Sequence, residues 1–112
     1  MMSHRIEQVN ELVKQEISHL LVSHLEMPLN SLVTVIDVET SRDLRHATVF
    51  ISVLPISQTG TALKRLRAQI GILQFELNRK LRFKPLPRIR FVVDRTEATA
   101  AEVEEILNRS ND

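Results

Sequence analysis

The hydrophobic and polar positions near the start of the chain repeat every three or four residues. Six apolar side chains recur at this spacing between residues 4 and 25, namely Ile6, Val9, Val13, Ile17, Leu20 and Leu21. Such a stripe is typical of an amphipathic helix with one buried face. Ser3 suits the N-cap position, and the sequence EMPLN that follows predicts the end of the helix.

The pattern then changes to that of two β-strands. Residues 32–40 (LVTVIDVET) are rich in β-branched side chains. Residues 46–54 (HATVFISVL) alternate, so that Ala47, Val49, Ile51 and Val53 face one way. The connecting sequence SRDLR is short, and we therefore expect an antiparallel hairpin.

The helical period returns after a loop at residues 55–62. Apolar residues again step by three and four positions, at Leu63, Leu66, Ile70, Leu73, Leu77 and Leu81. This stripe continues in phase past Gly71, which predicts a bend at Gly71 within one buried helical face. The prolines at positions 85 and 87 end the helix, because proline disfavours helical geometry in the residue before it.

The remaining sequence predicts one more strand and one more helix. In RIRFVV (88–93), Ile89, Phe91 and Val93 would point inward. The acidic tail at 96–110 reads as a final helix, with Thr99 and Glu102 as a capping box. The predicted order is α-β-β-α-β-α. We expect a single α+β domain over residues 1–112, with helices covering one face of a three-stranded sheet.

The sequence contains few of the residue patterns that are typical of an enzyme active site. His19 and His24 would lie about 140° apart around a helix, which does not suit a shared metal ion. Asp37 and Glu39 share a strand face but have no partner histidine or lysine nearby in the sequence. The chain has no cysteine, no long apolar run and no signal-peptide pattern. We expect a cytoplasmic, non-catalytic monomer without metal, cofactor, small-molecule substrate or membrane contact.

The net charge of +1 conceals a strong segregation of charge along the chain. Residues 1–63 carry four basic and seven acidic side chains, a net of −3. Residues 64–90 carry nine basic and one acidic, a net of +8, and residues 91–112 carry two basic and six acidic, a net of −4. This distribution favours a polyanion-binding surface in the middle segment.

The basic segment combines cations with small residues. On a helical wheel, Ala68 and Gly71 lie opposite the leucine stripe and between positive side chains, so a phosphate backbone would approach closely there. Phe75 would stack on a base. The residues that we expect to contact RNA are Lys64, Arg65, Arg67, Ala68, Gly71, Arg79, Lys80, Arg82, Lys84, Arg88 and Arg90.

Other interpretations of these residues remain open. In one alternative, Phe75 and Ile72 pack beneath the N- or C-terminal helix. In another, Gly71 serves only to let helices pack closely. The basic segment 64–90 would pair with the acidic C-terminal helix, or it would dock an acidic protein as part of a protein-interaction module.

Three segments resemble the bacterial ribosome-binding factor A family in order and spacing. They are RIEQVNELVKQEIS (5–18), VTVIDVETSRDLRHATVFISVL (33–54) and IGILQFELNRKLRFKPLPRIRFVVD (70–94). The second is similar to the family's strand–turn–strand signature, including Ser41, Asp43 and Leu44. The third is similar to its glycine-containing helix and to the strand that ends in Asp94.

This resemblance implies a type II KH-like domain that binds RNA. It also implies an assembly factor that binds the immature small (30S) ribosomal subunit and its 16S rRNA and assists late maturation and rRNA processing, often in the cold. Gly71 matches the glycine of the family's kinked Ala-x-Gly helix junction. Gln69 stands where that junction has alanine, and Gln74 stands where the family has arginine.

Overall fold

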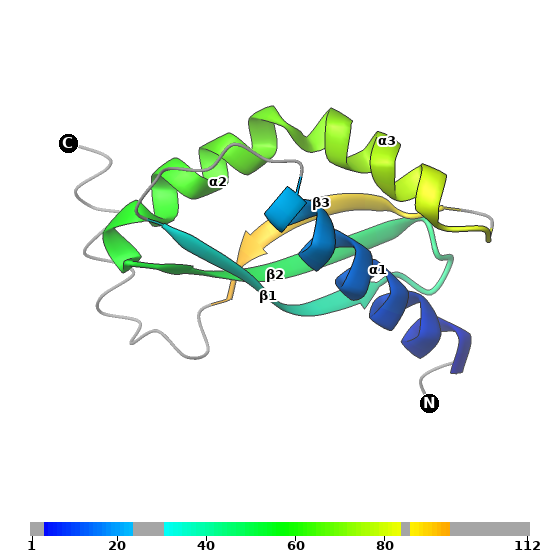
Figure 1. Ribbon diagram of the computed structural model, residues 1–112. Helices are drawn as coiled ribbons and strands as arrows, with labels where there is room; N and C mark the ends of the chain where they lie inside the picture. Colours follow the sequence, from blue (N-terminus) through cyan, green and yellow to red (C-terminus); the bar gives the residue numbers. More distant parts are fainter. Residues whose placement is uncertain (1–3, 24–30, 84–85, 95–112) are drawn as a thin grey trace.

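The computed structural model describes residues 4–23, 31–83 and 86–94 (Figure 1). Its elements are α1 (His4–Ser23), β1 (Leu32–Thr40), β2 (His46–Leu54), the short 3-10 helix η1 (Ile56–Gln58), α2 (Thr59–Ala68), α3 (Ile70–Lys80) and β3 (Arg88–Val93). The predicted order is confirmed through the third strand. The helix predicted at 96–110 lies outside the described residues.

The three strands form a mixed sheet with β2 in the centre. β1 pairs with β2 in antiparallel register, which confirms the hairpin, and β3 pairs with β2 in parallel register. A bulge between Val35 and Asp37 shifts the register of β1. Because the bulge adds one residue, Val35 and Val38 are both buried although three positions separate them.

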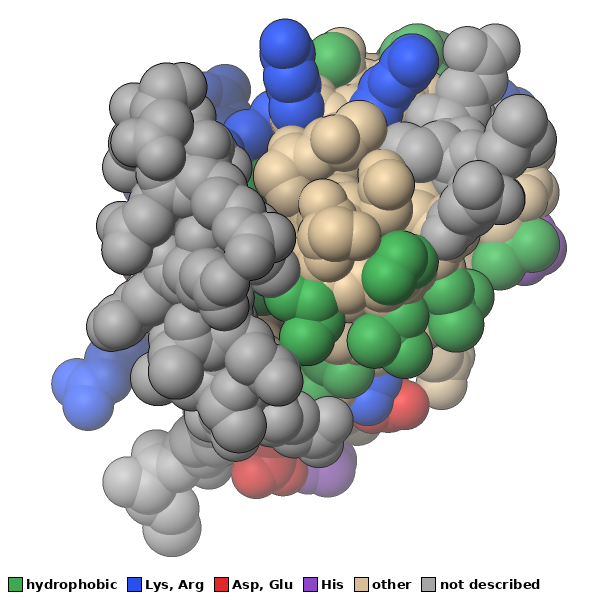
Figure 2. All heavy atoms as spheres, turned by 90° about the vertical axis from the view of Figure 1, so that its left-hand side faces the viewer, with side chains coloured by type: hydrophobic (Ala, Val, Ile, Leu, Met, Phe, Trp, Pro, Cys, Tyr) green, Lys and Arg blue, Asp and Glu red, His purple; other side chains and the backbone are tan. Residues whose placement is uncertain are grey.

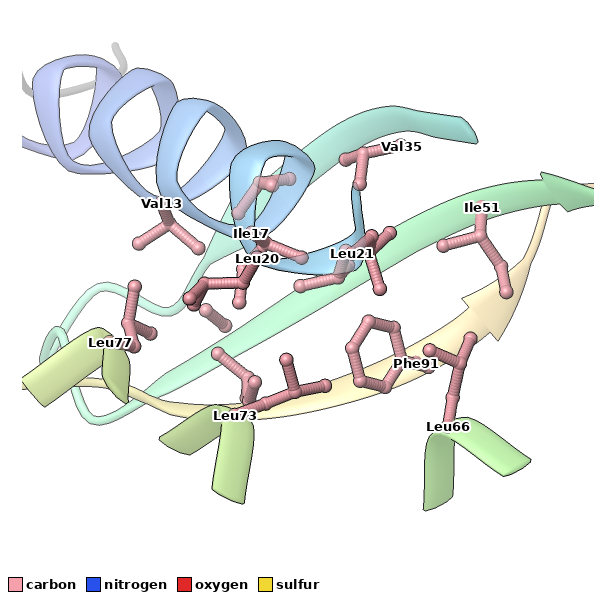
Figure 3. Packing of buried hydrophobic residues seen from close by; sticks show 14 of the residues in the cluster. Val13, Ile17, Leu20, Leu21, Val35, Ile51, Leu66, Leu73, Leu77 and Phe91 are labelled. Carbon is pink, nitrogen blue, oxygen red and sulfur yellow. The ribbon is translucent and has the colours of Figure 1, made fainter. Parts of the chain in front are cut away.

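The helices cover one face of the sheet, as predicted. Val9, Val13, Ile17, Leu20 and Leu21 of α1 are buried, and they converge on the buried side chains of α2, α3 and β3 (Figure 3). The inward positions of β2 are the predicted ones, and each is buried. One apolar core therefore fixes both the sheet and the helix pair that lies above β3.

The long helix predicted from the leucine stripe is divided at Gln69. Its backbone angles, φ −105° and ψ 9°, leave the helical region, so α2 ends at Ala68 and α3 begins at Ile70. Leu66, Leu73 and Leu77 are nevertheless all buried. The predicted bend is present, but the residue that makes it is Gln69, and Gly71 lies in the first turn of α3.

The turn between β1 and β2 is held by Asp43. Its Oδ1 accepts hydrogen bonds from the Ser41 hydroxyl at 2.6 Å and from the backbone N–H of Arg45 at 3.1 Å. These bonds lower the pKa of Asp43, with the Ser41 hydroxyl contributing most. Leu44 has a positive φ of 62° and packs its side chain against the core, which offsets the cost of that backbone conformation.

Candidate nucleic-acid interface

The exposed side of α2 and α3 carries most of the residues predicted to contact RNA. We call this the helical basic surface, and its members are all exposed: Lys64, Arg65, Arg67, Ala68, Gly71, Arg79 and Lys80. They lie opposite the buried leucines of the same helices. Arg82 follows α3 and is also exposed. Figure 2 views the end of the molecule where α2 begins, and it shows Lys and Arg side chains along the upper edge.

The junction between α2 and α3 is organised by Gln69. Its backbone N–H donates to the carbonyls of Arg65 and Leu66 at 3.2 Å, and its side-chain amide donates again to the Arg65 carbonyl at 3.2 Å. These bonds satisfy carbonyls that the end of α2 would otherwise leave open. At the same point α3 begins without a side-chain cap.

Gly71 leaves the start of α3 accessible from solvent. It is exposed, has no positive φ, and a Cβ placed on it would have no atom within 4 Å. Neither backbone conformation nor close helix packing therefore requires glycine here. Arg65 and Arg67 lie just before this exposed helix start, and their guanidinium groups would favour an anion there.

Two apolar side chains extend this surface along α3. Ile72 is 55% exposed and Phe75 is 62% exposed, so neither is packed beneath the N-terminal helix α1. The C-terminal helix of the other interpretation lies outside the described residues. The guanidinium carbon of Arg79 lies 6.0 Å from the centre of the Phe75 ring. Arg79 also forms an ion pair with Glu76 at 3.3 Å. These contacts hold the cation beside an open aromatic face.

Arg88 and Arg90 do not lie on the helical basic surface. Ile89 and Phe91, with which they alternate, are buried against the helices, so the two arginines point to the opposite face of the sheet. The sequence suggested one continuous basic patch. Because side chains alternate along a strand, the basic residues instead lie on two surfaces, the exposed side of the helices and the opposite face of the sheet. Lys84 lies outside the described residues.

Gln74 performs a role that sequence reasoning missed. Its amide oxygen accepts the Ile89 N–H at 2.9 Å, and its amide nitrogen donates to the Pro87 carbonyl at 3.0 Å and to Asn78 Oδ1 at 3.0 Å. The side chain therefore joins α3 to the free edge of β3. Local sequence patterns give no signal for this contact, because the partners are 13 and 15 positions away.

Groups typical of metal or membrane sites are not found in the described part of the chain. No cluster of three or more His, Cys, Asp or Glu residues is arranged there to hold a metal ion. None of the described helices is long and apolar enough to cross a membrane.

Comparison with known proteins gives a consistent match. The family model described as Ribosome-binding factor A matches residues 5–107. The ribosome-binding factor A of a Synechococcus species is 33% identical over 111 residues, covering 96% of this chain and 79% of that protein. That of Acetivibrio thermocellus is 28% identical over 109 residues, covering 96% and 89% respectively.

Solved structures match as well. The crystal structure of ribosome-binding factor A from Thermus thermophilus has a TM-score of 0.57 and 27% identity, and covers 80% of this chain and 92% of that one. A homology model of the Thermus thermophilus factor was fitted into a cryo-EM map of its complex with the 30S subunit. It has a TM-score of 0.60 and 26% identity, and the match covers 88% of this chain and 100% of that one. The predicted KH-like fold is thereby confirmed.

Proposed function

Because the chain belongs to the ribosome-binding factor A family, we propose that it binds the immature small ribosomal subunit through 16S rRNA. In this proposal the protein is a non-catalytic cytoplasmic monomer that assists late maturation and rRNA processing, often in the cold. The whole chain would act as one RNA-binding domain.

The similarity to a factor fitted into a 30S complex is the observation that carries this proposal. The helical basic surface supplies the chemistry that RNA binding requires. Positively charged side chains displace counterions from phosphates, and this release provides much of the affinity of RNA-binding proteins. The segregation of eight net positive charges into residues 64–90 supports the same assignment.

We place the RNA backbone at the junction of α2 and α3. There, Arg65 and Arg67 offer guanidinium groups, and exposed Gly71 offers no side chain that would keep a phosphate away from the helix start. Phe75, exposed and flanked by Arg79, provides a surface on which an unpaired base would stack.

Sedimentation tests the partner. Lysate from cells that accumulate immature small subunits is separated on a sucrose gradient at low salt, and the protein is followed by immunoblotting. We expect it to sediment with the small subunit. Its recovery only at the top of the gradient, or with an acidic protein of another kind, would contradict the proposal.

Charge reversal tests the surface. Arg65→Glu with Arg67→Glu is expected to weaken binding to purified immature subunits by at least tenfold and to flatten its salt dependence, since each lost phosphate contact lowers the slope by about 0.7–0.9. The control is Arg42→Glu with Arg45→Glu, which changes the charge equally at exposed positions in the β1–β2 turn. If the two variants bind alike, the contact surface lies elsewhere.

A further inference from the structure

The face of the sheet that the helices leave uncovered carries a second polar site. Near the end of β1 and the starts of β2 and β3 there is an open cavity of about 500 Å³. Its lining includes Glu39, Ser41, His46, Thr48, Arg88 and Arg90, and we call it the sheet pocket. A cavity of this size is in the range that holds small organic ligands.

Strand register brings these side chains together. Glu39 pairs with Thr48, and Thr48 pairs with Arg90, so a carboxylate, a hydroxyl and a guanidinium form one row across three strands. His46 and Arg88 form part of the neighbouring row. Adjacent strands lie about 4.8 Å apart, which places the backbones of Glu39 and Arg90 about 10 Å from each other.

The two arginines of the pocket are available to an anion. Arg90 Nε donates to Thr48 Oγ1 at 3.0 Å, which fixes the guanidinium over the sheet and leaves its terminal N–H groups unused by that contact. Among the described residues no ion pair joins Arg88 or Arg90 to a carboxylate.

We propose that the sheet pocket binds one unpaired nucleotide of RNA. Arg88 and Arg90 hold its phosphate, because guanidinium groups match phosphate oxygens in charge and geometry. The imidazole of His46 provides a stacking surface for the base. Glu39, at the far end of the row, accepts a hydrogen bond from an exocyclic amino group, as carboxylates do from cytosine N4. This inference rests on the proposed function, since it takes RNA as the partner.

The arrangement selects a single strand over a duplex. In an A-form duplex the free N–H of the exocyclic amino group faces a deep, narrow major groove that side chains do not enter, and the base faces are stacked on their neighbours, so neither Glu39 nor His46 would reach its group. The pocket also gives the protein a second contact with RNA, on the opposite side of the sheet from the helical basic surface.

Nuclear magnetic resonance on the intact protein locates the site without any mutation. The ¹⁵N-labelled chain is titrated with the RNA pentanucleotides UUCUU and UUUUU and with cytidine monophosphate. We expect UUCUU to shift the amide signals of Thr48, Ile89 and Arg90, and to bind about tenfold more tightly than UUUUU, as one base-specific hydrogen bond allows. Shifts confined to α2 and α3, no binding, or equal affinity for UUCUU and UUUUU would overturn the inference.

Two pairs of arginine substitutions distinguish direct contact with the RNA from long-range electrostatic attraction. Arg88→Ala with Arg90→Ala should weaken UUCUU binding about tenfold, whereas Arg42→Ala with Arg45→Ala, beside the pocket but not lining it, should have a smaller effect. Glu39→Ala should abolish the preference for UUCUU over UUUUU. Equal losses in the two arginine variants, or an unchanged preference in Glu39→Ala, would overturn the inference.

Cosedimentation of the same proteins with immature subunits keeps the two proposals distinct. A wild-type chain that binds subunits but not UUCUU overturns the sheet pocket and leaves the proposed function standing. A chain that binds UUCUU at the pocket but no subunit supports the sheet pocket and contradicts the proposed function.

Discussion

Gln74 lies where α3 meets the free edge of the sheet. An edge strand exposes backbone donors and acceptors that otherwise pair with water or with another chain. The Gln74 amide carries one acceptor and one donor in the same spacing as a peptide group, and it binds the Ile89 N–H and the Pro87 carbonyl at once. It therefore takes the place of a short piece of neighbouring strand. An arginine at this position, as in the family pattern, would lack the acceptor.

Replacing Gln74 by methionine should destabilise the fold. The change preserves side-chain length but removes both hydrogen bonds to β3, and we expect the free energy of unfolding to fall by about 1–2 kcal/mol. Urea unfolding measures it. Gln15→Met is the control, because the Gln15 side chain lies on an exposed helix surface and donates a hydrogen bond to Glu11 in the same helix. This change should alter the free energy of unfolding by less than about 0.5 kcal/mol.

Gly71→Ala separates stability from binding at the helix junction. Because the added methyl group meets no atom and the backbone is already helical, we expect stability to rise by about 0.5–1 kcal/mol. Binding to immature subunits should nevertheless weaken, since the methyl group covers the exposed start of α3. The two measurements are urea unfolding and cosedimentation, and unchanged binding would remove Gly71 from the interface.

At the level of elements, the spacing of apolar residues predicted which faces are buried better than single residues predicted where a helix ends. The leucine stripe located the buried face of α2 and α3 correctly, because burial is a property of a repeating pattern. The position of the interruption was predicted less well. Glycine is the usual signal of a weakened helix, but here Gln69 makes the break, and its stabilising bonds to Arg65 depend on side-chain geometry that composition does not specify.

The β1–β2 turn should make stability depend on pH. The folded chain holds the pKa of Asp43 below its ordinary value of 3.8 through the Ser41 hydroxyl and the Arg45 N–H. The charged form is thus favoured by folding, so its contribution is present above the unfolded pKa and is lost as pH falls through the folded pKa. We expect Asp43→Asn to be less stable than the wild type at neutral pH, by an amount that shrinks on acidification.

Urea unfolding at neutral pH and at several acidic values measures this difference. Ser41→Ala, which removes the strongest donor to the carboxylate, should reproduce part of the effect. A gap between wild type and Asp43→Asn that stays constant over the whole acidic range would show that the turn is not stabilised by the charge of Asp43.

For the whole molecule, the basic segment is continuous in sequence but divided in space. Arg65 and Arg88 belong to the same run of positive charge, yet one lies on a helix and the other on the outer face of the sheet. The alternation of apolar and charged side chains along β3 was sufficient to predict that Arg88 and Arg90 point away from the core. The alignment of Arg90 with Thr48 and Glu39 in one row was not, because it depends on the register of three strands and on a bulge in β1.

The two surfaces should contribute independently to RNA binding. Arg65→Glu with Arg67→Glu changes the helical basic surface, and Arg88→Ala with Arg90→Ala changes the sheet pocket on the other side of the sheet. Because the sites share no contact residues, the losses in binding free energy for immature subunits should add within about 0.5 kcal/mol in the combined variant. A coupling of more than about 1 kcal/mol would mean that both sets of arginines act on one RNA segment through a shared geometry.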